Sequence, residues 1–199
     1  MHLLLATHNE HKRREFARLL DARSDGERWQ VQALPTAVIL PPECGKTFAE
    51  NALGKARAAA AATGQATIAD DSGIEAAALG GAPGVRSARF AGAHASDVEN
   101  LQKLMREVPA GSALEYACAI AYVDPAKGIE RVFEGRCAGR LAPAPRGQRG
   151  FGYDPAFLPD EGPGGLTMAE LSEQQKDAIS HRGRAARALL EWLDRQRPA

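Results

Sequence analysis

An apolar segment that ends in two adjacent carboxylates constrains the fold of this chain more than any other feature. Residues 66–69 are typical of a buried strand, and Asp70, Asp71, Ser72 and Gly73 follow them directly, with the last two predicting a turn. Successive side chains of an extended chain point to opposite faces, so one Asp can hold a hard cation or a water while the other braces the site from behind. Buried carboxylates need a counter-charge, which Mg²⁺ or lysines supply. The alternative is a strand-to-turn junction whose Asp residues only cap backbone donors.

The spacing of apolar residues predicts strands and helices that alternate early in the chain, followed by a pair of hairpin strands. Expected strands cover residues 2–7, 30–34, 38–40, 114–123, 129–139 and 151–158, with 74–79 as an antiparallel continuation of the carboxylate segment. Expected helices cover residues 10–20, 48–63, 96–108 and 181–196. Thr47 and Glu50 match a capping box at the start of the second helix, and Gly64 ends it. The pattern favours an α/β fold, a mixed sheet with helices on its faces and no separate linker.

Composition limits the class of protein. The 199 residues suit one domain, or one domain with a modest lobe, and Lys plus Arg (25) balance Asp plus Glu (25), so no bulk affinity for DNA or anionic membranes is indicated. Cys44, Cys118 and Cys137 lack disulfide or zinc spacing and predict free thiols in a reducing compartment. The first residues are too short for a signal-peptide core, and no apolar run approaches the ~20 residues that span a bilayer. We therefore expect a cytoplasmic protein.

The junction between the first expected strand and helix carries candidate phosphate-binding groups. It consists of Thr7, His8, Asn9, Glu10, His11 and Lys12. Helix N-termini at such junctions bind phosphate through backbone N–H groups, and Lys12 adds a full charge. The alternative is an ordinary capped helix with a surface Lys. His8 and His11 lack a third ligand for zinc.

Residues 43–47 precede the second expected helix. Gly45, Lys46 and Thr47 resemble the end of a Walker A loop, but that motif needs a glycine at position 40, where the chain has Leu40. Thr47 therefore serves better as a helix cap. Glu43 is either a partner of the helix dipole or a second Mg²⁺ ligand beside the carboxylate segment.

The later part of the chain offers candidates for binding a planar base. Phe151 beside Gly152 could accept a stacked ring, an interaction worth ~1–3 kcal/mol per base. Lys176, His181 and Arg182 flank the start of the last expected helix, and an Arg fork suits carbonyl or phosphate acceptors. The alternatives are core aromatics in a strand and a solvated basic helix start.

Taken together and in order, these motifs resemble the inosine/xanthosine triphosphate pyrophosphatase family. The motifs are Thr-x-Asn-x-x-Lys, Glu-x-Gly-x-Thr-Phe-x-Glu-Asn-Ala, Asp-Asp-Ser-Gly, Leu-Gly-Gly-Ala-Pro-Gly-x-x-Ser-Ala-Arg, Gly-Phe-Gly-Tyr-Asp-Pro and Lys-x-Ala-x-Ser-His-Arg, spread from Leu3 to about Leu193. The resemblance implies an elongated mixed α/β protein with two lobes around a central nucleotide-binding cleft. It also implies a homodimer, dependence on Mg²⁺, and hydrolysis of ITP, dITP and XTP to the monophosphate plus pyrophosphate.

The same resemblance implies roles for residues at the matching positions. Asp71 binds the metal with Glu43 and accepts a proton, while Asp70 and Lys55 support the reacting centre. The substrate-binding set is Thr7, His8, Asn9, Glu10, His11, Lys12, Ser72, Phe151, Gly152, Tyr153, Asp154, Lys176, His181 and Arg182. The chain departs from its relatives at His8, where many have Gly, and at Arg86, where many have an aromatic residue.

Base selection follows from donor and acceptor chemistry. Hypoxanthine and xanthine present a 6-oxo acceptor, whereas adenine presents a 6-amino donor, so the donor-only Arg182 favours the former. Two alternatives stay open: a pyrophosphatase of the septum-formation-inhibitor type, which prefers pyrimidine or modified nucleotides, and a catalytically silent nucleotide-binding protein. The Ser-His-Arg end argues against the first, and paired carboxylates beside a phosphate site argue against the second.

Overall fold

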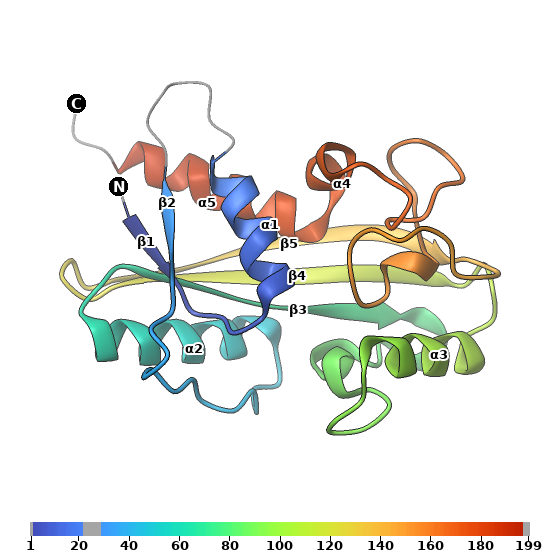
Figure 1. Ribbon diagram of the computed structural model, residues 1–199, viewed down its shortest axis with the longest axis horizontal. Helices are drawn as coiled ribbons and strands as arrows, with labels where there is room; N and C mark the ends of the chain where they lie inside the picture. The colour runs from blue at the N-terminus through green and yellow to red at the C-terminus, as the bar shows by residue number, and fades with distance from the viewer. Residues whose placement is uncertain (1, 22–28, 197–199) are drawn as a thin grey trace. The chain divides into compact units, whose positions relative to one another are not determined.

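The protein is described by a computed structural model, which covers residues 2–21 and 29–196. Its strands are β1 (His2–Leu5), β2 (Gln30–Ala33), β3 (Thr67–Ala76), β4 (Ala113–Asp124), β5 (Ile129–Leu141) and β6 (Phe157–Pro159). Its α-helices are α1 (Glu10–Asp21), α2 (Phe48–Thr63), α3 (Asp97–Glu107), α4 (Glu173–Ile179) and α5 (His181–Arg195). The strands form one mixed sheet in the order β2-β1-β3-β4-β5-β6, and helices flank it (Figure 1). The predicted α/β class with a mixed sheet is confirmed.

The chain divides into two compact units. Unit 1 comprises residues 1–71, 119–134 and 185–199, and unit 2 comprises residues 72–118 and 135–184. Strand β3 contributes Thr67–Asp71 to unit 1 and its remaining residues to unit 2. The boundary therefore falls between Asp71 and Ser72, which are consecutive in the carboxylate segment.

In unit 1, β1 pairs in parallel with both β2 and β3. Leu5 is opposite Ala33 on one side and Ile68 on the other. Helix α1 connects β1 to β2 on one side of it in the sheet. Helix α2 then connects β2 to β3, which lies on the other side of β1. Since parallel crossovers are right-handed, these two helices lie on opposite faces, as Figure 1 shows. The sheet order therefore reverses between β1 and β3, the topological switch point at which open α/β sheets bind ligands.

Helix α2 packs through small side chains. Thr47 caps it by accepting a hydrogen bond from Glu50 N–H, and Gly64 ends it in the left-handed conformation with φ +68°. The Glu50 carboxylate accepts from Lys46 N–H, one residue before the predicted partner, so the capping box is only half formed. The buried face of α2 is mostly alanine, and such small side chains allow a helix backbone to approach its neighbours closely.

Unit 2 has a hydrophobic core of its own. Fully buried members include Ile74, Leu104, Leu141, Phe157 and Met168. Tyr116 and Phe157 pack with ring centroids 4.5 Å apart. Strand β6 pairs antiparallel with β5, with Leu158 opposite Arg140.

Three details of the predicted strands are wrong. Residues 38–40 are not a strand, and the segment 151–158 is extended only at Phe157–Pro159 after a 3₁₀ turn at Asp154–Ala156. The turn expected after Asp71 is absent, because β3 continues through Ser72 and Gly73 to Ala76, and Ala77–Leu79 is a short 3₁₀ helix. Ser87 Oγ accepts a hydrogen bond from Ile74 N–H at 2.8 Å, which supports the continued strand within unit 2. Burial overrides the turn preference of the Ser-Gly pair.

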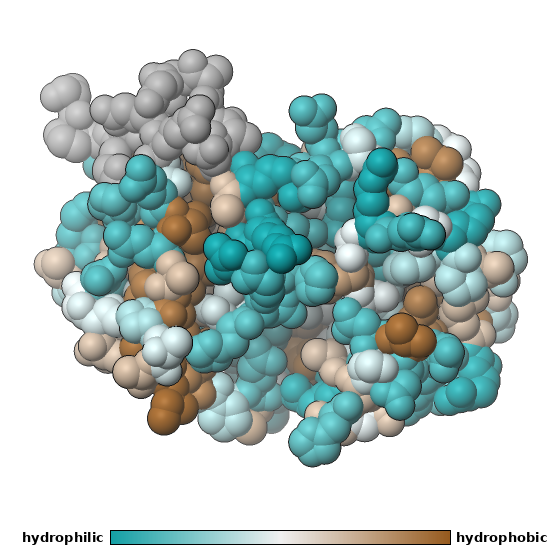
Figure 2. Space-filling view, viewed as in Figure 1, coloured by the Kyte–Doolittle hydropathy of each residue, from teal (hydrophilic) through white to brown (hydrophobic). Residues whose placement is uncertain are grey.

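The hydropathy of the surface differs between elements of unit 1. The surface over α1 is hydrophilic, whereas brown atoms gather in a narrow band over the region of the edge strand β2 (Figure 2). Ile39, which follows that strand, is 87% exposed. Within residues 2–21 and 29–196, no helix has the length and apolar character needed to cross a membrane.

Candidate functional site

The carboxyl ends of β1 and β3 bring a lysine and an aspartate together in unit 1. Ala6 N–H donates to the Ile68 carbonyl at 2.8 Å, which places the residues after β1 beside Asp70. Lys12, one turn into α1, reaches this position, and its Nζ lies 3.0 Å from Asp70 Oδ2. The Asp70 side chain is fully buried and that of Lys12 is 14% exposed. The switch point therefore holds a buried ion pair.

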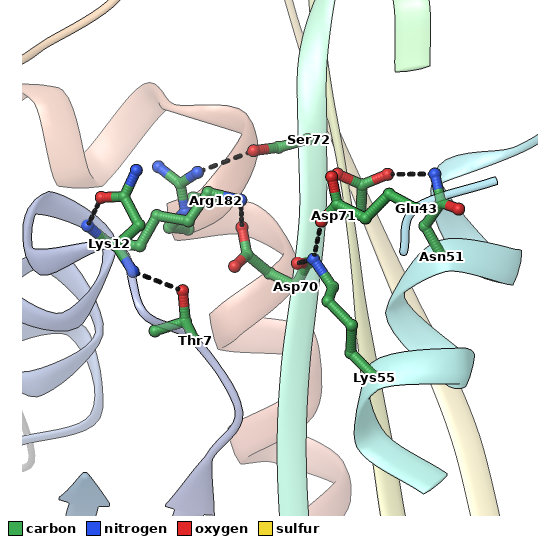
Figure 3. A network of polar contacts seen from close by, with 10 residues as sticks. Thr7, Lys12, Glu43, Asn51, Lys55, Asp70, Asp71, Ser72 and Arg182 are labelled. Atoms are coloured by element: carbon green, nitrogen blue, oxygen red, sulfur yellow. Dashed lines mark hydrogen bonds and ion pairs between the residues drawn. The ribbon is translucent and has the colours of Figure 1, made fainter. Parts of the chain in front are cut away.

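Asp70 and Asp71 point to opposite faces of β3, as their alternation predicts (Figure 3). Asp70 meets α1 through Lys12, whereas Asp71 Oδ2 accepts a hydrogen bond of 2.7 Å from Asn51 Nδ2 on α2. Asp71 is 5% exposed. The two carboxylates are thus held by different helices and can serve different purposes.

Lys55 connects the Glu43 segment to β3. Its Nζ donates to Glu43 Oε1 and, at 2.6 Å, to the backbone carbonyl of Asp70 (Figure 3). Burial on its own would lower the pKa of Lys55, but the negative charges of Asp70, Glu43 and Asp71 outweigh it and raise the pKa. The ammonium group is therefore charged and balances a cluster of carboxylates.

Glu43 and Asp71 lie side by side, although 28 positions separate them in the sequence (Figure 3). The pKa of Asp71 is raised, first by burial and further by the charge of Glu43, while Lys55, the Asn51 hydrogen bond and Lys12 oppose the shift. Two carboxylates whose ionised forms repel one another are suited to a shared cation. Among residues 2–21 and 29–196, no group of three or more His, Cys, Asp or Glu side chains is arranged to hold a metal.

The turn after β1 is organised around the start of α1. Thr7 Oγ1 accepts from Asn9 N–H at 3.2 Å, and Asn9 Oδ1 accepts from Lys12 N–H at 3.0 Å. Asn9 therefore caps the helix, and its geometry presents the helix N-terminus and Lys12 together.

The other residues of that turn face solvent. His8 and His11 are exposed on the surface. Glu10 accepts hydrogen bonds from Arg13 at 2.7 Å and from Arg14 at 3.1 Å. The Arg13 hydrogen bond is the main cause that lowers the pKa of Glu10 to about 2. The Glu10 side chain thus belongs to an exposed ion-pair cluster at the start of α1.

A second polar cluster lies in unit 2 around Asp154. Its carboxylate accepts from Lys176 Nζ at 2.6 Å, from Tyr116 Oη at 3.1 Å and from Phe151 N–H at 3.0 Å. Asp154 is 3% exposed and Lys176 is 7% exposed. The ring centroid of Phe151 lies 5.3 Å from Lys176 Nζ and 5.6 Å from the guanidinium carbon of Arg182. Asp154 thus positions Lys176 and the Phe151 backbone.

The remaining predicted residues of unit 2 surround this cluster. Arg182 donates to Ser72 Oγ at 2.8 Å, and the ring of His181 stacks on Tyr116 with centroids 4.5 Å apart. Tyr153 is buried and donates from Oη to the Ser87 carbonyl at 2.7 Å, so it supports the loop from within the core. Gly152 N–H donates to Asp97 Oδ2 at 2.9 Å.

Three residues with clear roles were not predicted from the sequence. Asn51 holds Asp71, Tyr116 holds both Asp154 and His181, and Asp97 holds Gly152. Asparagine is a weak helix former, so its presence in the first turn of the alanine-rich helix α2 was a signal that the Asn51 side chain has a specific role. No local pattern distinguishes Tyr116 or Asp97.

Fold and site together define an open-sheet α/β protein whose acidic and basic side chains gather at the switch point of its parallel strands. The chain belongs to the Ham1 family, whose family model matches residues 3–192. It is 48% identical over 202 residues to the "dITP/XTP pyrophosphatase" of Corynebacterium glutamicum (strain R), covering 97% of each chain. Among solved structures it resembles a HAM1 protein from Coxiella burnetii, with TM-score 0.82, 36% identity and coverage of 98% and 99%. It also resembles a nucleoside-triphosphatase and dITP/XTP pyrophosphatase from Mycobacterium abscessus, with TM-score 0.71, 42% identity and coverage of 96% and 99%.

Proposed function

We propose that this chain is a Mg²⁺-dependent nucleoside triphosphate pyrophosphohydrolase that converts dITP, ITP and XTP to the monophosphate and pyrophosphate. The observation that carries the proposal is the pairing of Glu43 and Asp71 beside Lys55, with Lys12 on the other face of β3 at the switch point. Full-length relatives named dITP/XTP pyrophosphatases support the substrate class.

The residues present fit Mg²⁺. Carboxylate oxygens are the ligands it prefers, and it commonly uses one or two carboxylates while phosphates and waters complete the octahedron. Glu43 and Asp71 supply that number, and a cation held by them would offset the mutual repulsion of their ionised forms. Bound there, Mg²⁺ would neutralise charge on phosphate oxygens.

The other roles follow from position and charge. Asp71, whose pKa is raised chiefly by burial, would take the proton of a water that attacks the α-phosphorus. The bond from phosphorus to the bridging oxygen breaks, and pyrophosphate leaves. Lys12 and Lys55 would stabilise the negative charge on the departing oxygens. Thr7 and Asn9 would hold the phosphate chain together with the α1 N-terminus.

We assign the base to residues of unit 2. Phe151 would stack on the purine, and Arg182 would donate to its 6-oxo group. Lys176, His181 and Ser72 would complete the nucleotide contacts, while Asp154 and Tyr153 support them from behind. Further proposals, carried by family resemblance, are that residues 1–199 act as one domain, that two copies form a homodimer, and that the enzyme is cytoplasmic.

A nucleotide panel tests the proposed function. Pyrophosphate release from dITP, ITP, XTP, dATP, dGTP, dCTP and dTTP is measured with Mg²⁺ and again with excess EDTA. We expect the first three to exceed the standard nucleotides by at least about 10²-fold in kcat/KM and to stop with EDTA. A preference for dCTP or dTTP would replace this proposal with a pyrophosphatase of the septum-formation-inhibitor type. Nucleotide binding without hydrolysis would identify a silent binding protein.

Replacing Arg182 tests the base assignment. Arg182→Ala is expected to narrow the preference for ITP over ATP by roughly tenfold or more, because the donor that distinguishes a 6-oxo from a 6-amino group is lost. The ratio of kcat/KM for the two substrates is measured on one sample, so any loss of folded protein cancels. An unchanged ratio removes Arg182 from this role.

A further inference from the structure

We propose that Asn51 is a positioning residue that locks the Asp71 carboxylate and the Glu43 segment into one geometry. This inference rests on the proposed function, since it gives Asp71 and Glu43 their shared purpose. Asn51 is 5% exposed and lies in the first turn of α2. It is separated from Asp71 by 20 positions, so the contact is set by the fold.

Both ends of the Asn51 amide are engaged. Its Nδ2 donates to Asp71 Oδ2 at 2.7 Å, and its Oδ1 accepts from Gly45 N–H at 2.7 Å. Reversing the amide would set an oxygen against a carboxylate and an NH₂ group against an N–H. The two partners therefore fix the amide orientation, and the amide holds Oδ2 of the Asp71 carboxylate in place.

Gly45 is matched to this arrangement. A Cβ at position 45 would lie 2.7 Å from Asn51 Oδ1 and 2.8 Å from the Glu50 Cβ. Glycine thus permits the close approach of backbone and amide. Gly45 is two residues after Glu43. The Asn51 amide therefore links the backbone next to Glu43 to the side chain of Asp71.

The consequence is a fixed spacing between the two carboxylates. Lys55 holds Glu43 through an ion pair, whose strength depends on the charges of both groups. Asn51 adds directional hydrogen bonds at both ends, which fix angles as well as distance. Groups that orient metal-binding side chains in this way typically contribute 10- to 100-fold to metal affinity or activity.

The test compares Asn51→Ala with Asn100→Ala. Asn100 is a matched control: it is 2% exposed in α3, accepts from Ala91 N–H at 2.7 Å and donates to the Ala88 carbonyl at 3.2 Å. Both substitutions remove a doubly bonded buried amide. Both variants should therefore be less stable to unfolding than wild type. Only Asn51 contacts a carboxylate, so only Asn51→Ala should also change kcat and metal affinity.

Three quantities are measured: kcat and KM for dITP at saturating Mg²⁺, and the Mn²⁺ affinity of the substrate-free protein by calorimetry. Asn51→Ala should lower kcat about 10- to 100-fold, weaken Mn²⁺ binding about tenfold, and leave KM within roughly threefold. Asn100→Ala should keep all three within about twofold of wild type.

Gly45→Ala gives a second perturbation of the same amide. In the wild-type background it should lower kcat about tenfold or more. In the Asn51→Ala background it should lower kcat less, because the contact with the amide oxygen is gone and the contact with the Glu50 Cβ remains. Equal kcat and equal Mn²⁺ affinity in Asn51→Ala and Asn100→Ala would overturn the positioning role. If wild type binds Mn²⁺ but hydrolyses none of the nucleotides, the proposed function fails, while weaker Mn²⁺ binding by Asn51→Ala still supports the positioning role.

Discussion

Asp71→Asn is expected to lower kcat for dITP by roughly 10²–10⁴-fold, because the change removes both a cation ligand and the proton acceptor. The amide is nearly the same size as the carboxylate and can still pack beside Asn51. Steady-state rates at saturating Mg²⁺ give the comparison. A variant with nearly wild-type kcat would remove Asp71 from the reaction.

The same variant is expected to keep or raise the stability of the metal-free protein. The Asp71 pKa is higher in the folded state than in the unfolded state, chiefly through burial, so the ionised side chain destabilises the fold. Wild-type stability should fall as pH rises from the ordinary Asp value through the raised pKa, and above it the penalty is complete. In EDTA, the unfolding midpoint of Asp71→Asn should therefore be higher than that of wild type at high pH. At low pH the two midpoints should converge.

Asp124→Asn is the matched control for both measurements. Asp124 is also buried, at 6% exposure, and its carboxylate accepts from Tyr122 Oη and from the N–H groups of Ala126 and Lys127. It takes no part in the proposed site. We expect its kcat to stay within about twofold of wild type, so a loss confined to Asp71→Asn cannot be a general effect of neutralising a buried aspartate.

Lys176→Met is expected to lower the free energy of unfolding by about 3–5 kcal/mol, because it leaves the buried Asp154 carboxylate without its cation. The Lys176 and Asp154 side chains are 8% and 4% exposed, so water cannot solvate the Asp154 carboxylate once the lysine charge is lost. Hydrogen bonds from Tyr116 and Phe151 remain but do not neutralise it. Urea unfolding measures the change.

The exposed pair Arg57 and Glu130 supplies the comparison. Its separation, 2.6 Å, equals that of Lys176 and Asp154, but its side chains are 57% and 42% exposed. Arg57→Met should lower stability by only about 0–1 kcal/mol. Adding Asp154→Asn to Lys176→Met should recover part of the loss, since no buried charge is then left. Equal effects of Lys176→Met and Arg57→Met would show that burial does not determine the strength of the Asp154 pair.

The sequence predicted those parts of the fold that depend on local signals. The Thr47 cap and Gly64 mark both ends of α2, and the alternation along β3 correctly predicted opposite directions for Asp70 and Asp71. The Ser-Gly turn was wrong, because burial of β3 outweighs the local preference of Ser72 and Gly73.

The supporting contacts of the site could not be predicted in this way. Asn51 meets Asp71 across 20 positions, and Tyr116 meets His181 only because β4 and α5 converge in the folded chain. Such pairs have no spacing rule within one element. The sequence left Glu43 as either a partner of the helix dipole or a metal ligand beside the carboxylate segment. In the structure Glu43 lies beside Asp71, and the roles assigned to the two carboxylates stay predictions.

A crystal soaked with Mn²⁺ and an inosine triphosphate analogue that resists hydrolysis between the α- and β-phosphates tests the central claim most directly. The anomalous difference map should show a peak within about 2.5 Å of an oxygen of both Glu43 and Asp71, with the phosphate chain beside Lys12. A peak that touches neither carboxylate, or a phosphate chain bound away from Lys12, would contradict it.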